Sequence, residues 1–575
     1  MKLRYFKIIL LFTGLLTIGS CKKKLDINYD PDRLPDSNDP IPQLLTSAQV
    51  NLGFEGGSDL FRYATLIMQH MSGGASQANQ TWDYYRYNIT GSDLNNVWSS
   101  INATTLSDLE LIIKRGGLSP HYTGIAKILK AYEYGLVVDV WGDVPFTEAQ
   151  QLTANTQPKY DDDATIYPKL ITLLSEAITE LNATTSVLTP GANSVIYPGT
   201  FATIRANWIK LANTLKLRLL LHYSKKDPAF CVAQITALVN TAGITFFASN
   251  ADNFSLTFYD IASQRNPISA FEVSRPNYLF ADASMLALMA SKNDPRRPYY
   301  FTSFPYAGIP LPITVISSAA TAAGNVLQIA STTGTAVGMR ISGTNIPANT
   351  FATAVTATTI TLSNNVTGAG VAGGASIVVA PENFVGVSAA APPVAPNNNY
   401  SRIHTFLRGA VGATSPAAPP FVYTGAAPQR MLTYAEYCFI RAEAALMGAP
   451  GSAQAFYTAG ITASMQETPI SSIQHLGISA TEIANYLAAN GTLTGTPAQQ
   501  LRQIIEEKYI ALFGVSVEPW SDWRRTGYPV ISAPTNAVIG TVPRTLFYPQ
   551  SEIDLNPNNP GQKSASLQAG PFWDN

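Results

Sequence analysis

The sequence predicts a mainly α-helical fold of tetratricopeptide-like helical hairpins, interrupted by a small all-β insertion. Two observations predict the helices: apolar residues recur at helical spacing in long segments, and several of these segments are paired by short turns. A third observation predicts the insertion. Residues 311–379 contain a single charged residue, Arg340, among short alternating stretches bounded by Gly and Asn, which are strand signals.

The composition is that of a globular protein without a nucleic-acid surface. Hydrophobic residues make up 46% of the 575 residues and charged residues 13%. The chain is too long for one hydrophobic core, so we expect several domains or one long helical array. The formal charge of −1 gives no basic excess, which a nucleic-acid-binding protein would need.

The N-terminus has the pattern of an exported lipoprotein. Basic residues precede an apolar run from Ile8 to Ile18, and small residues then lead to Cys21. This predicts a signal peptide over residues 1–20, with the Cys21 thiol acylated as the new N-terminus. The alternative, a membrane-spanning helix, would need roughly 20 apolar residues. Residues 21–42 are rich in Asp, Asn and Pro and are predicted to form a lipid-anchored tether.

The first helical part is predicted over residues 43–310. A stripe of apolar residues predicts one helix over Tyr122–Val140, and a second stripe predicts another over Thr200–Tyr223. The stripes consist of Ile125, Leu129, Tyr132 and Leu136, and of Ile204, Trp208, Leu211, Leu215 and Leu219.

The second helical part is predicted over residues 380–575. Thr433 and Glu436 form a capping-box pattern that starts a helix, and Gly448 ends it. A further helix is expected over Ser452–Met465, so the two would form a hairpin. The ~34-residue period of regular tetratricopeptide repeats is absent, so we expect degenerate hairpins.

The stretch "YGLVVDVWGDVPFTEAQ", residues 134–150, is interpreted as a helix end. Gly142 suits a left-handed cap after the apolar helix, and Pro145 prevents the helix from resuming. No nucleophile, base and orienting group occur together there. We therefore assign the stretch to the fold and not to ligand contact.

The sequence lacks the common signatures of catalysis. The motifs G-x-S-x-G, H-E-x-x-H and G-x-x-x-x-G-K-[ST] do not occur. The five histidines are scattered without an i, i+4 pair, and Cys231 and Cys438 lie more than 200 residues apart. We expect no catalytic residue, no metal site, no cofactor and no disulfide. Two carboxylates in a cleft would still suffice for a glycosidase, so a hydrolase stays an alternative.

The segment "QANQTWDYYRYNITGSD" is the candidate ligand site. Sugar rings present apolar C–H faces and a rim of hydroxyl groups, so their sites combine aromatic platforms with amide and carboxylate groups. The alternative is a strand pair whose alternate aromatic side chains are buried. The expected platforms are Trp82, Tyr84 and Tyr85, and the expected hydrogen-bonding side chains are Asn79, Gln80 and Asp83.

Several long motifs, in order along the chain, resemble the SusD/RagB family in its SusD-like branch. The resemblance covers nearly the whole chain except residues 311–379. The motifs are "LDINYDP", "AYEYGLVVDVWGDVPFTEA", "NWIKLANTLKLRLLLHY", "NDPRRPYY", "YAEYCFIRAEAAL", "EEKYIALFGVSVEPWSDWRRTGYP" and "PRTLFYPQSEIDLNPNN".

The resemblance implies a helical lipoprotein on the outer face of a Gram-negative outer membrane. Such proteins cap a SusC-like TonB-dependent transporter, capture an oligosaccharide or in some members a peptide, and close over the barrel as a lid. Two features depart from the family pattern. Three lysines follow Cys21 where acidic residues are common, and the β insertion is not a general family feature.

Three functions follow as hypotheses. The first is a non-catalytic surface lipoprotein that binds a nutrient oligomer and delivers it to the transporter. The second is a membrane-anchored polysaccharide hydrolase. The third is an adhesion or peptide-binding lipoprotein, in which the β insertion dominates.

Overall fold

The computed structural model describes residues 41–74, 80–151, 154–303, 313–335, 339–347, 350–380, 384–390, 400–412, 421–468 and 477–575. The predicted signal peptide, Cys21 and the tether up to residue 40 lie outside the described residues. The first described helix begins at Ile41, two residues before the predicted start of the helical part.

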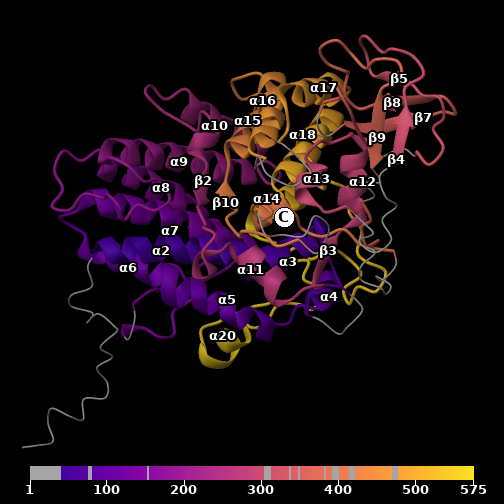
Figure 1. The fold of residues 1–575 in the computed structure, drawn as a ribbon. Helices are drawn as coiled ribbons and strands as arrows, with labels where there is room; N and C mark the ends of the chain where they lie inside the picture. The colour runs from indigo at the N-terminus through magenta and orange to yellow at the C-terminus, as the bar shows by residue number, and fades with distance from the viewer. Residues whose placement is uncertain are drawn as a thin grey trace, which may run out of the picture.

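Long helices from the first half of the chain stack side by side in a layered array (Figure 1). Neighbours in sequence pack as hairpins, α6 against α7 and α8 against α9. The larger elements of this part are α2 (Ile41–Gly57), α3 (Asp59–Ile67), α4 (Gln80–Tyr85), α5 (Asn95–Ser99), α6 (Leu106–Arg115), α7 (Pro120–Trp141), α8 (Asp163–Leu181), α9 (Phe201–His222), α10 (Pro228–Val239), α11 (Pro267–Ser274), α12 (Ala283–Ser291) and α13 (Arg297–Tyr300).

The second half of the chain adds another helical hairpin, α15 with α16, against which α18 packs. Thr433 caps α15 by accepting the backbone N–H of Glu436, which is one of the two bonds of the predicted capping box, while the Glu436 carboxylate pairs with Arg218. The helices here are α14 (Thr405–Arg408), α15 (Tyr434–Leu446), α16 (Ala453–Gln466), α17 (Ala480–Asn490), α18 (Pro497–Ala511), α19 (Glu518–Thr526) and α20 (Gln550–Leu555).

Two short antiparallel ribbons tie distant parts of the helical body together. Strand β1 (Met71–Gly73) pairs with β3 (Leu279–Ala281), and β2 (Phe254–Leu256) pairs with β10 (Gln429–Leu432). Each ribbon joins segments more than 150 residues apart in sequence, so the helical body is one interlocked unit and not a chain of separate repeats.

The β insertion forms a six-stranded antiparallel sheet that projects from the body at the upper right of Figure 1. A bridge between Ser317 and Ile329 joins the two outer strands, so the sheet curls into a barrel-like module with a hydrophobic core of its own. The strand order is β4–β9–β6–β7–β8–β5, with β4 at Ile313–Ile316, β5 at Val326–Gln328, β6 at Arg340–Ser342, β7 at Thr350–Val355, β8 at Thr359–Leu362 and β9 at Ser376–Ala380.

A network of buried ion pairs crosses the centre of the helical body. Lys508 on α18 contacts Glu518 at 2.9 Å and Asp522 at 2.8 Å on α19. Arg525 then joins Asp522 to Glu443 on α15, at 2.7 and 2.6 Å. Pairing offsets the cost of burying these charges, so this network fixes the relative positions of the helices.

The stretch at residues 134–150 ends α7 as predicted. Gly142 has a φ of +71°, and the Trp141 indole donates to the Phe547 carbonyl at 2.9 Å. Asp143 accepts the backbone N–H of Asp163 at the start of α8. The stretch therefore joins two helices to the C-terminal segment.

The elements described above confirm the predicted fold class, which is mainly α-helical with a small β insertion.

Candidate functional site

The candidate site is centred on α4, which follows directly on the β1–β3 ribbon. The Thr81 hydroxyl donates to the Tyr278 carbonyl at 2.5 Å, and the Gly74 N–H donates to the same oxygen at 3.1 Å. A Cβ atom on Gly73 would overlap the Thr81 carbonyl, so only glycine allows this close approach. The ribbon thus fixes where the side chains of α4 lie.

Trp82 presents a partly exposed indole ring among charged side chains. Its inner side stacks on Tyr85, with ring centroids 5.9 Å apart and an angle of 29° between the planes. The Arg86 guanidinium lies 5.6 Å from the Trp82 ring centre and pairs with Asp83 at 2.7 Å. Trp82 and Asp83 therefore place a partly exposed aromatic ring next to a carboxylate that is paired with Arg86.

Tyr84 and Tyr85 are not surface platforms, and this part of the prediction needs correction. Tyr84 is 1% exposed and Tyr85 is 0% exposed. The Tyr84 hydroxyl donates to Asp93 at 3.1 Å and the Tyr85 hydroxyl donates to Asp282 at 2.8 Å. Burial raises the pKa of Asp282 to about 7, which marks this contact as part of the core.

The remaining predicted residues have different positions. Gln80 is exposed at the start of α4, and Asn79 lies outside the described residues. The predicted contacts that the structure places at the surface are therefore Gln80, Trp82 and Asp83.

The backbone of Tyr278 lies against α4 through its carbonyl, a contact that sequence reasoning missed, and its ring packs on Phe271. Tyr278 is half-buried, and the Arg275 guanidinium lies 5.9 Å from its ring centre. Asn277 accepts a hydrogen bond from Arg402. The only signal in the sequence is the short "RPNY" turn, whose pairing with α4 depends on the β1–β3 ribbon.

A second aromatic-rich segment, "DPRRPYYF", begins at Asp294, and most of its residues belong to the core of the helical body. Arg296 is fully buried and pairs with Asp294 and with Glu507 at 2.9 Å. Tyr299 and Tyr300 are fully buried as well. The described part of this cluster therefore forms core and does not line a ligand site.

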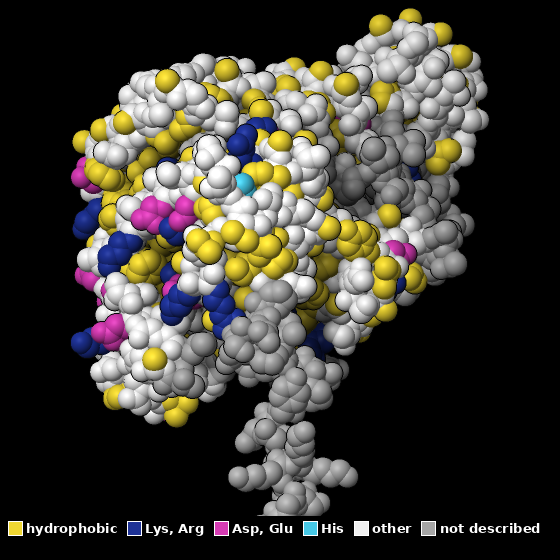
Figure 2. Space-filling view, turned by 90° about the vertical axis from the view of Figure 1, so that its left-hand side faces the viewer, with side chains coloured by type: hydrophobic (Ala, Val, Ile, Leu, Met, Phe, Trp, Pro, Cys, Tyr) yellow, Lys and Arg dark blue, Asp and Glu magenta, His cyan; other side chains and the backbone are white. Residues whose placement is uncertain are grey.

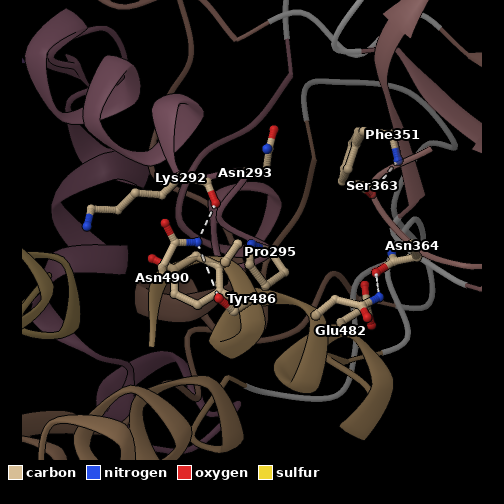
Figure 3. Close-up of a pocket in the computed structure, with 11 residues that line it drawn as sticks. Lys292, Asn293, Pro295, Phe351, Ser363, Asn364, Glu482, Tyr486 and Asn490 are labelled. Carbon is tan, nitrogen blue, oxygen red and sulfur yellow. Dashed lines mark hydrogen bonds between the residues drawn. The ribbon is translucent and has the colours of Figure 1, made fainter. Parts of the chain in front are cut away.

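A small cavity of about 90 Å³ lies where the β module meets the helical body. Phe351 and Asn364 of the module face Glu482 and Tyr486 of α17 across it (Figure 3). The Asn485 amide donates to Asn364 at 3.0 Å and links the two parts. At roughly 30 Å³ per water molecule, this space suits a few waters better than a sugar ring.

A larger cavity of about 480 Å³ lies beside β2 and β10. Asn207, Asn250 and Asn253 line it together with the ion pair of Arg430 and Glu467. Tyr197, its aromatic lining residue among the described residues, is only 3% exposed. The cavity offers hydrogen bonds to a polar molecule but no stacking platform.

In the described part of the chain, no group of three or more His, Cys, Asp or Glu side chains could hold a metal ion. Cys231 and Cys438 are both buried free thiols, as predicted. None of the helices between Ile41 and Asn575 that the structure describes is long and apolar enough to cross a membrane.

Charged side chains of both signs are interspersed on the face shown in Figure 2. On the part of this face that the structure describes, neither sign gathers into a broad patch.

This architecture defines a tetratricopeptide-like helical protein with a partly exposed aromatic surface on α4. The chain belongs to the SusD-like family described as "Starch-binding associating with outer membrane", whose model matches residues 33–354 and 393–549. No curated protein matches the sequence.

Solved structures share the fold at low sequence identity. A chitin-binding protein is 23% identical, with a TM-score of 0.66, over 93% of this chain and 100% of its own. A SusD homologue from Bacteroides fragilis is 21% identical, with a TM-score of 0.64, over 92% and 100%. A chitin-binding SusD homologue from Flavobacterium johnsoniae is 18% identical, with a TM-score of 0.62, over 93% and 98%.

Proposed function

We propose that this protein is a surface lipoprotein of the outer membrane that captures an oligosaccharide and delivers it, as a lid, to a SusC-like TonB-dependent transporter. Membership of the family carries this proposal, since the family model covers most of the chain. Cys21 would hold the lipid anchor, so the globular body would remain tethered to the outer leaflet.

The surface around α4 supports glycan capture. Trp82 offers a stacking face, while Asp83 and Gln80 can accept and donate hydrogen bonds to hydroxyl groups at the rim of a sugar. A shallow site of this kind binds weakly at each contact, so several sugar units of an oligomer would contribute together.

The proposal includes no catalytic step, no metal and no cofactor. A peptide is the alternative ligand, because peptides, like carbohydrates, offer hydrogen-bonding groups to this surface.

The experiment is a binding panel of soluble glycans and peptides, measured by affinity electrophoresis and calorimetry on the purified chain. We expect saturable binding of at least one glycan and no new reducing ends after prolonged incubation. Binding of peptides alone would replace the glycan by a peptide as the ligand. Reducing ends that disappear when one carboxylate is replaced would instead identify a hydrolase.

The adhesion hypothesis is tested on cells. If the β module dominates function, deletion of residues 311–379 abolishes surface attachment and leaves growth on the bound glycan intact. The proposal predicts instead that growth on the glycan requires the helical body and that surface attachment does not require residues 311–379.

A further inference from the structure

The groove between α8, α9 and α10 contains a buried lysine with no acidic neighbour in its lining. These three helices lie side by side, away from α4 (Figure 1). The groove has a volume of about 540 Å³, which falls within the range of small-molecule sites. Lys216 lines it and is only 8% exposed.

The lining of the groove is basic and otherwise neutral. Arg205 is the second charged residue, and Asp and Glu are absent from the lining residues in the described part of the chain. Arg205, Ile209, Asn213 and Lys216 follow helical spacing and share one face of α9. Two cationic side chains and an amide therefore stand beside an apolar residue on the same wall.

The opposite wall is a turn held firmly against α9. The Asn213 amide donates to the Thr245 carbonyl at 3.0 Å, and the Phe247 N–H donates to the Thr214 hydroxyl at 3.2 Å. The groove is thus formed before any ligand arrives, which reduces the entropy lost on binding.

Lys216 has no acidic partner among the residues that line the groove. Burial lowers the pKa of Lys216 because the ammonium group loses its hydration. Several other buried cations in the described part of the chain pair with a carboxylate, such as Arg218 with Glu436 at 2.7 Å. An isolated buried ammonium costs free energy that an anionic ligand would offset.

We propose that this groove binds a small polar molecule through a single oxyanion, a carboxylate, sulfate or phosphate group, with Lys216 as its main partner and Arg205 at the rim. The apolar wall would contact the body of the molecule, and Asn213 and the neighbouring hydroxyl groups would contact its polar edge. This site is separate from the glycan surface on α4 and does not depend on the function proposed for that surface.

The test uses the full chain at constant ionic strength, with glucuronate, inorganic phosphate, inorganic sulfate and glucose as probes. Thermal unfolding and calorimetry are measured for the unchanged chain, for Lys216→Met and for Lys226→Met. Lys226 is an exposed lysine beyond the end of α9, so Lys226→Met controls for the loss of one positive charge.

We expect at least one anion to bind and to raise the melting temperature, while glucose does neither. Lys216→Met is expected to lower the affinity roughly tenfold or more, because a charge-assisted hydrogen bond is lost, and Lys226→Met to leave it unchanged. Binding of glucuronate alone identifies a sugar acid, whereas binding of phosphate or sulfate identifies a tetrahedral oxyanion.

The melting temperature without ligand provides a second readout. Lys216→Met removes the cost of the buried charge, so the variant is expected to fold and to melt at the same or a higher temperature than the unchanged chain. The proposal is overturned if none of the three anions binds, or if the anion binds equally well to Lys216→Met.

Discussion

Glu133→Gln is expected to change how the stability of the protein depends on pH. Glu133 on α7 is 1% exposed and Glu55 on α2 is 5% exposed. The Glu55 carboxylate also accepts hydrogen bonds from the hydroxyl groups of Ser100 and Thr105, at 2.7 and 2.9 Å. Burial raises the pKa of Glu55 to about 7, and burial together with the adjacent Glu55 raises the pKa of Glu133 well above its ordinary value. Two carboxyl groups so close cannot both ionise easily, so the folded protein retains a proton here at neutral pH.

The sign of the effect follows from the raised pKa values. Between pH 4.5 and pH 7 the unfolded chain releases protons that the folded chain holds, so the contribution of this pair to stability is fully present below pH 4.5 and is lost as the pH rises through the folded pKa. A shift of this size corresponds to about 3 kcal/mol at most for one carboxyl group. A Gln amide at position 133 can donate to Glu55 without a proton to lose, so the variant should gain stability relative to the unchanged chain as the pH rises.

The assay is urea unfolding of both proteins at several pH values from 4.5 to 8.5. The difference in unfolding free energy between Glu133→Gln and the unchanged chain should grow in favour of the variant by up to about 3 kcal/mol across this range. Glu176→Gln is the control, because Glu176 pairs with Lys127 at 2.7 Å with its side chain 51% exposed, and surface pairs contribute little. A difference for Glu133→Gln that does not vary with pH would refute this reasoning.

Three further predictions concern the C-terminus, the ribbon and the anchor. Trp573→Ala removes a fully buried indole that donates to Asp139 at 3.1 Å. It should lower the free energy of unfolding, measured in urea, by roughly 3 kcal/mol or more. A loss below about 1 kcal/mol would contradict the packing described. Gly73→Ala should displace α4 by overlap with Thr81, lowering both the melting temperature and glycan affinity, and unchanged values for both would exclude the close approach. Cys21→Ala should abolish palmitate incorporation and release the protein from the membrane fraction, and retention there would disprove the lipid anchor.

The helical body could be predicted from the sequence because its signals are local. The expected helices over Tyr122–Val140 and Thr200–Tyr223 correspond to α7 and α9 within a few residues. The capping-box pattern at Thr433 also identified the start of its helix, since the hydroxyl group accepts a backbone N–H three residues away, although the Glu436 side chain pairs with Arg218 instead of completing the box. Strand alternation in the β module is equally local, so the module was recognised as well.

The candidate site could be predicted only in part because its geometry depends on distant segments. Tyr85 is buried by Asp282, nearly 200 residues away, and α4 is positioned by the ribbon that brings Tyr278 beside Thr81. Spacing within the segment could not separate the exposed Trp82 from the buried tyrosines. The alternative of buried aromatic side chains was correct for two tyrosines, but they lie on a helix and not on paired strands.

The most direct test of the central claim is calorimetric titration of Trp82→Ala with the best glycan from the panel. Phe230→Ala serves as the control, since Phe230 is an aromatic residue of α10 that is 37% exposed and distant from α4. Capture of the glycan by the α4 surface predicts that Trp82→Ala lowers the affinity roughly tenfold or more, while Phe230→Ala leaves it unchanged. An unchanged affinity for Trp82→Ala, with the melting temperature preserved, would contradict the claim that this surface holds the ligand.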